Sequence, residues 1–237
     1  MSPLEMALVV VATVVSFTVS ASAGLGGSLV LVPALALVLG TKEGVALAAL
    51  LLAANNVVKV IAYRAVLPFR AALPLVACTV VGAVLGASLL VAAPVWLVNA
   101  AVITMFVGSL VVERLRLRQP GRIGPPGLAL ASGATSGFSG TSGPLKGVAV
   151  KRLGIDRRHT VGAASLMSLA GDVAKTSVFA EASLLGSQEV LVGLAAVPLM
   201  IAATFAGRAL NGRLSERHYD VLFWSVMGGY TLRLLAA

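Results

Sequence analysis

Two lysines lie within otherwise apolar helical segments, where a positive charge could bind an anion. Lys59 follows Asn55 by four residues and Lys175 follows Asp172 by three, so each polar residue shares a helical face with its lysine. Asp172 should form an ion pair with Lys175, whereas Lys59 has only amides nearby. Because ionisable residues are costly inside a membrane and usually functional there, these four residues are candidates for a transport pathway. The alternative is that Lys59 only extends from a helix end to the membrane interface.

Two breaks rich in glycine and hydroxyl residues offer a second kind of anion ligand. The first helical turn after a break has unpaired backbone N–H groups and a partial positive charge, and glycine lets a ligand approach that backbone closely. The candidates are Gly26, Gly27 and Ser28 at the first break, and Ser139, Gly140, Thr141, Ser142 and Gly143 at the second. The alternative is that these small residues serve only close packing between helices.

Other chemistries find little support in the sequence. Cys78 is the single cysteine, and His159 and His218 both lie beside charged loops, so neither a disulfide nor a metal cluster is expected. The chain has no phosphate-binding loop of the Walker type. We therefore expect no enzyme activity, no cofactor and no metal.

The composition is that of an integral membrane protein. Apolar residues make up 58% of the chain and charged residues 11%, against about 25% charged residues in a soluble domain. The formal net charge of +9 comes from basic residues in short loops, so membrane orientation explains it and nucleic acid is not an expected partner. Five long stretches contain no charged residue: 6–41, 71–112, 123–145, 190–207 and 221–232.

Spans through lipid must be helices here, because an open sheet would leave backbone groups unpaired and the apolar runs do not alternate as barrel strands do. Apolar runs and breakers predict helical segments at 4–20, 25–40, 45–62, 71–91, 94–112, 127–138, 143–153, 160–180, 188–207 and 219–235. The pieces 127–138 and 143–153 are too short to cross a hydrocarbon core of about 30 Å, so they predict a re-entrant hairpin.

The same landmarks recur in the same order in both halves of the chain. Gly27 corresponds to Gly143, and the segment 54–59 corresponds to 170–175, which aligns the two lysines. We therefore predict an all-α integral membrane protein, a polytopic helical bundle of two inverted repeats within one transmembrane domain. Each repeat is a broken or re-entrant hairpin followed by three transmembrane helices. The first repeat is 1–118 and the second is 119–237.

The distribution of charge predicts the orientation. Basic residues dominate four loops, which should be cytoplasmic: 63–70, 113–122, 151–158 and 208–217. The loop near 92–93 is uncharged and 181–189 holds only acidic charges, so these two should face outside.

The sequence resembles the sulfite exporter TauE/SafE family of membrane transporters over essentially its whole length. The resemblance rests on four motifs: Gly24-Leu25-Gly26-Gly27-Ser28 leading to Pro33, Ser136-Gly137-Phe138-Ser139-Gly140, Leu39-Gly40, and Gly82-x-x-x-Gly86. It implies export or uptake of sulfite, sulfonates and related small organic anions.

A secondary transporter of a small anion in the cell membrane, with several spans, is therefore the expected function. A channel or a cation-coupled carrier of another small solute, with Asp172 as the cation ligand, is the alternative, and a membrane scaffold or intramembrane enzyme is the third class. The expected partners are the lipid bilayer, the anionic substrate and a coupling proton or sodium ion. A homo-oligomer is left open.

Overall fold

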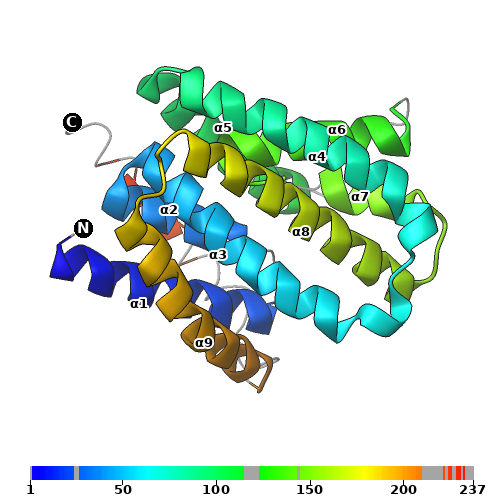
Figure 1. Ribbon diagram of the computed structural model, residues 1–237, viewed down its shortest axis with the longest axis horizontal. Helices are drawn as coiled ribbons and strands as arrows, with labels where there is room; N and C mark the ends of the chain where they lie inside the picture. The colour runs from blue at the N-terminus through cyan, green and yellow to red at the C-terminus, as the bar shows by residue number, and fades with distance from the viewer. Residues whose placement is uncertain are drawn as a thin grey trace. The chain divides into compact units, whose positions relative to one another are not determined.

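The protein is all-helical in a computed structural model that describes residues 2–23, 27–114, 123–142, 145–209, 221, 224–225, 228–230 and 232, and these residues include no strand (Figure 1). The helices are α1 (Pro3–Ala23), α2 (Ser28–Leu39), α3 (Thr41–Ala62), the short 3-10 helix η1 (Arg64–Val66), α4 (Phe69–Ala92), α5 (Val95–Arg114), α6 (Pro125–Ser139), α7 (Leu145–Lys151), α8 (Arg157–Glu181) and α9 (Ser187–Ala209). The predicted helical segments are confirmed to within a few residues from α1 to α9.

Proline marks the start of three of these helices. Pro68 precedes α4, Pro94 precedes α5, and Pro125 is the first residue of α6. Proline has no N–H to donate and its ring fixes φ near the helical value, so it is favoured at the start of a helix. These positions explain why the helix starts could be predicted from the sequence. Pro33, Pro74 and Pro198 nevertheless lie inside α2, α4 and α9.

The chain forms two compact units. The first unit comprises residues 1–55 and 183–237, and the second comprises residues 56–182. Helix α3 begins in the first unit and its last turns belong to the second. The predicted repeats, 1–118 and 119–237, divide the chain by internal similarity and not by contacts, so that division stays a prediction.

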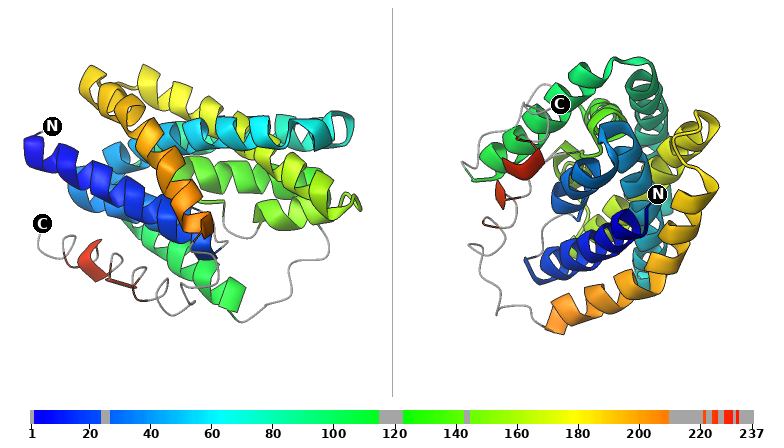
Figure 2. Two further views of the ribbon diagram at one scale, coloured as in Figure 1. Left: turned by 90° about the horizontal axis from the view of Figure 1, so that it is seen from below. Right: turned by 90° about the vertical axis from the view of Figure 1, so that its left-hand side faces the viewer.

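In the first unit, α1 packs on both α2 and α9, and the crossing of α1 and α9 is visible in Figure 2. Thr41 at the start of α3 shares a hydrogen bond of 2.7 Å with the buried hydroxyl of Tyr230. Gly193 on α9 lies against the side chains of Leu47 and Leu50 on α3. Tyr230 and α9 thereby both contact α3.

In the second unit, α4 packs along α6 through two glycine pairs, one on each helix. A Cβ atom built on Gly82, Gly86, Gly133 or Gly137 would lie only 2.1 to 2.4 Å from a backbone oxygen of the facing helix. The two helices are therefore in direct backbone contact, which only glycine permits at these positions. The sequence motif Gly82-x-x-x-Gly86 is a packing feature.

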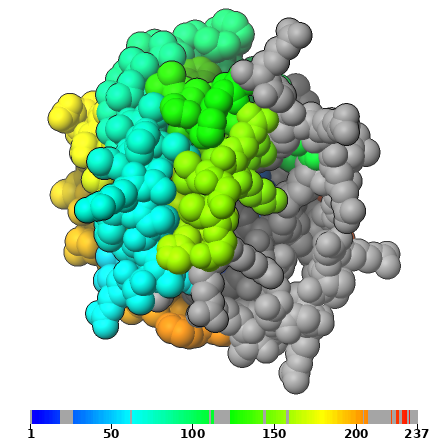
Figure 3. All heavy atoms as spheres, turned by 90° about the vertical axis from the view of Figure 1, so that its right-hand side faces the viewer, coloured from blue at the N-terminus to red at the C-terminus, as the bar shows by residue number. Residues whose placement is uncertain are grey.

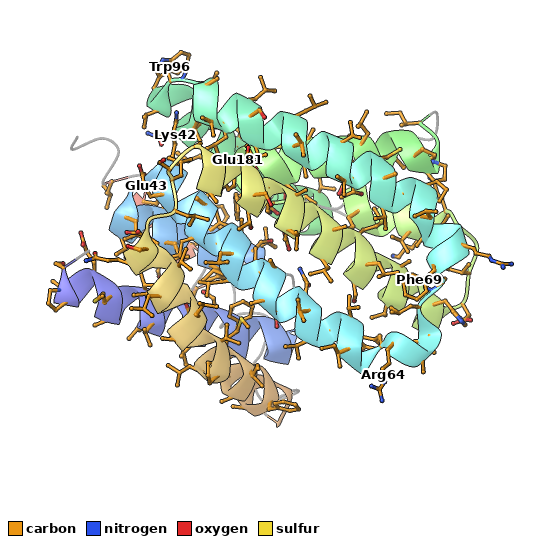
Figure 4. The ribbon with its side chains drawn as sticks, viewed as in Figure 1. Lys42, Glu43, Arg64, Phe69, Trp96 and Glu181 are labelled. Carbon is orange, nitrogen blue, oxygen red and sulfur yellow. The ribbon has the colours of Figure 1, made fainter. Side chains whose placement is uncertain are left out.

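Two of the predicted cytoplasmic loops lie at the same end of the second unit. Gly162 in the first turns of α8 lies against the carbonyl of Val66 in η1, so the loops 63–70 and 151–158 are neighbours, as the space-filling view shows (Figure 3). Arg64 and Phe69 mark this end in Figure 4, and Glu181 and Trp96 mark the opposite end.

Two described helices are long and apolar enough to cross a membrane, by length and composition: Thr41–Ile61 and Phe69–Ala92. Shorter apolar helices are Pro3–Thr18, Ser28–Leu39, Val95–Ser109 and Ser187–Ala203. Helices α6 and α7 have 15 and 7 residues, or about 22 Å and 10 Å at 1.5 Å per residue, which is shorter than a hydrocarbon core.

Candidate functional site

The predicted ion pair between Asp172 and Lys175 is present in the second unit. Lys175 Nζ lies 2.8 Å from Asp172 Oδ1, and the two side chains are 1% and 10% exposed. The residues are one turn apart on α8, so the helix itself brings the charges together. Burial makes each charge depend on the other, because an unpaired charge in such a place is costly.

Both members of the pair have a further partner from another helix. Asn56 on α3 donates from Nδ2 to Asp172 Oδ2 at 2.6 Å. Lys175 Nζ donates to Ser136 Oγ on α6 at 2.9 Å. Both oxygens of the carboxylate are thus engaged, and two of the three N–H donors of the Lys175 ammonium are used.

A third lysine, Lys146, joins the same face of α8. It is the second residue of α7, it is half-buried, and its Nζ donates to Ser168 Oγ at 2.7 Å. Ser168, Asp172 and Lys175 follow each other at helical spacing along α8. Because Lys175 also reaches Ser136, helix α8 is hydrogen-bonded to both arms of the broken hairpin, to α6 and to α7.

Lys59 completes this group from the last turns of α3. Its side chain is exposed, and it lies one helical turn after Asn56, the residue that donates to Asp172. We call Lys59, Lys146, Lys175 and Asp172 the lysine cluster. It holds three positive charges against one negative charge, all within the second unit.

The second glycine break begins with a left-handed residue. Gly140 ends α6 with a φ of 81°, in the left-handed region that glycine adopts without strain, and its N–H donates to Ser136 O at 3.0 Å. Ser139 Oγ donates to Thr135 O at 2.9 Å, so this hydroxyl is used within its own helix. Thr141 is buried and Ser142 is half-buried. Gly143 lies outside the described residues.

The first break differs from the second. Gly27 precedes α2 with a φ of −57°, which any residue can adopt, and its carbonyl accepts from Leu31 N at 3.2 Å. Ser28 is the first residue of α2 and is half-buried. Asn55 is buried on α3, and like Gly27 and Ser28 it belongs to the first unit. Gly26 lies outside the described residues.

Four residues of the site were not among the sequence candidates: Asn56, Ser136, Lys146 and Ser168. Asn56 could have been identified from the sequence, because the correspondence of the segments 54–59 and 170–175 places it opposite Asp172. Lys146 could also have been identified from the sequence, because it is the single charged residue between the second break and the basic loop 151–158. Ser136 opens the motif Ser136-Gly137-Phe138-Ser139-Gly140, but its contact with Lys175 depends on how α6 packs beside α8.

Comparison with known proteins gives one match. The family model described as Sulfite exporter TauE/SafE matches residues 8–234, a range that includes both glycine breaks and the lysine cluster. No curated protein and no solved structure matches the chain.

Proposed function

Because the chain belongs to the sulfite exporter TauE/SafE family of membrane transporters, we propose that it is a secondary transporter that moves a small anion, such as sulfite, a sulfonate or a related oxyanion, across the cytoplasmic membrane. The observation that carries this proposal is the lysine cluster. An excess of positive charge among the helices of a membrane protein is costly unless an anion approaches it.

The alternative of a cation carrier fits the cluster less well. Asp172 would be the cation ligand, but its two oxygens already bind Lys175 and Asn56. A cation beside Asp172 would also meet the repulsion of the neighbouring lysines, which is strong where water is scarce. The charges therefore favour an anion over a cation.

An inverted repeat would explain how the site is reached from both sides in turn. Each half contains a helix, a break, a short helix and then longer helices, in the same order. Asn56 and Asp172, which the internal alignment matches to each other, are hydrogen-bonded to each other. In a two-fold arrangement, a position that contacts its own equivalent lies on the axis. Transporters built from inverted repeats bind substrate at the repeat interface near the midplane and expose it by rocking of the repeats.

The location proposed for the protein is the cell membrane, with several spans. The two basic loops at one end of the second unit support a single cytoplasmic side for that unit. Two candidate spans and four shorter apolar helices supply the apolar length.

Uptake into sealed proteoliposomes tests the proposed function. The purified chain should take up radiolabelled sulfite, sulfate or a sulfonate above the level of empty liposomes, and an imposed proton or sodium gradient should identify the coupling ion. Lys175→Met should reduce anion uptake at least about tenfold, because it removes a charge that stabilises the anion. Uptake of alkali cations without any anion uptake would reject an anion transporter.

A further inference from the structure

Lys146 is a half-buried lysine of the cluster that has no carboxylate partner among the described residues. Lys175 is paired with Asp172 at 2.8 Å and also binds Ser136, so its charge and most of its donors are committed. Lys146 Nζ donates to the neutral hydroxyl of Ser168, and no carboxylate of the described residues lies within ion-pair distance of it. Two of its three N–H donors therefore remain for a ligand.

The position of Lys146 suits a ligand-binding role. It is half-buried in the first turn of α7, after the second break, and Ser168 on α8 fixes the direction of its ammonium group. It shares the face of α8 that carries Asp172 and Lys175, so an anion held by Lys146 would lie within the field of the other lysines.

The number of charges indicates the valence of that anion. Three lysines and one aspartate leave an excess of two positive charges in the cluster, and the electrostatic attraction for an anion grows with the charge of that anion. Without Lys146 the excess would be one. Building on the proposed function, we infer that Lys146 determines the charge selectivity of the site and that it makes the site prefer doubly charged over singly charged anions.

A pair of anions with the same sulfur chemistry and different charge tests this inference. Sulfate carries two negative charges and methanesulfonate carries one, and both are fully ionised at neutral pH. Binding of each to the purified full-length protein in detergent is measured by calorimetry at one ionic strength. The wild type should bind sulfate more tightly than methanesulfonate.

Lys146→Met should weaken sulfate binding by about 10- to 100-fold, the effect of losing a charge-assisted hydrogen bond. Methanesulfonate binding should weaken less, by about 3- to 10-fold, because the electrostatic attraction to Lys146 scales with the charge of the ligand. Lys146→Arg keeps the charge and should keep the sulfate preference. Lys146→Gln keeps a donor for Ser168 without the charge, so it serves as a second neutral variant if the methionine variant does not fold.

Lys151→Met is the matched control, because Lys151 is an exposed lysine in the last turn of the same helix. It should leave both affinities unchanged. An equal loss for both anions in Lys146→Met and Lys146→Gln, or a wild type without sulfate preference, would overturn the inference and leave the proposed function standing. A wild type that neither binds nor transports any anion would instead reject the proposed function.

Discussion

Asp172 and Lys175 form the one part of the site in which two buried charges depend on each other. Each is held by a second bond, Asp172 by Asn56 and Lys175 by Ser136, so the pair connects α8 to α3 and α6. Loss of either charge would leave the other buried without its counter-ion. The pair therefore has a structural role as well as any role in transport.

Removing one member of the pair should cost more stability than removing both. Asp172→Asn and Lys175→Met should each destabilise the protein by roughly 3–5 kcal/mol, because each leaves an uncompensated buried charge. The double variant should be more stable than either single variant. Thermal unfolding in detergent measures all four proteins, and Glu181→Gln, at the exposed end of the same helix, is the control. Effects that simply add would show that the two charges act independently.

The site could be predicted from the sequence only where a single helix creates the contact. Asp172 and Lys175 are three residues apart, so helical geometry alone predicts their pairing. Lys146 and Ser168 meet through the packing of α7 against α8, which no local pattern encodes. Asn56, which was not a sequence candidate, donates to Asp172, because the rotation of α3 is set by tertiary contacts.

At the scale of elements, the contact between α4 and α6 positions one side of the site. Four glycines let the two backbones touch, and α6 carries Ser136, the hydrogen-bond partner of Lys175. Any change that separates α4 from α6 should also move Ser136. The close contact of α4 and α6 therefore helps to determine the position of Ser136 relative to Lys175.

Alanine at Gly82 or Gly133 should destabilise the protein by about 1–3 kcal/mol, because its Cβ would meet backbone at 2.1 to 2.2 Å and force the helices apart. Gly108→Ala on α5 is the matched control: no atom lies within 4 Å of its Cβ, and alanine favours a helix over glycine. Thermal unfolding in detergent compares the three variants. If Gly82→Ala is as stable as Gly108→Ala, the close contact is not required.

The order and bounds of the helices could be predicted because breakers and apolar runs are local signals. The sequence places the segment 71–91 well, and α4 extends from Phe69 to Ala92. Which helices touch could not be predicted, since α4 meets α6 across α5 and a long connection. Glycines spaced by four indicate that a helix packs closely, but they do not identify its partner.

At the scale of the molecule, the basic and acidic ends of the second unit predict its orientation in the membrane. Arg64 lies at one end and Glu181 at the other. Since basic loops stay in the cytoplasm, residues near Arg64 should be inside and the connection after Glu181 should be outside.

Single cysteines test this orientation in intact cells. In a background where Cys78 is replaced by alanine, Ala65→Cys and Ser187→Cys place a thiol at exposed positions in the two predicted loops. A membrane-impermeant thiol reagent should label position 187 from outside and should label position 65 only after the membrane is opened. Labelling of both positions in intact cells would contradict the topology and with it the inverted repeat.

The hydrogen bond between Asn56 and Asp172 has a consequence for how such a protein could arise. If the two halves descend from one half-length chain that paired with itself, the ancestral dimer had the same side chain at both positions. Two aspartates that meet at 2.6 Å cannot both be ionised. Only after gene duplication and fusion could one copy keep an amide while the other acquired a carboxylate. Under that descent, the acidic residue of the site is an asymmetry that only the fusion of the two halves made available.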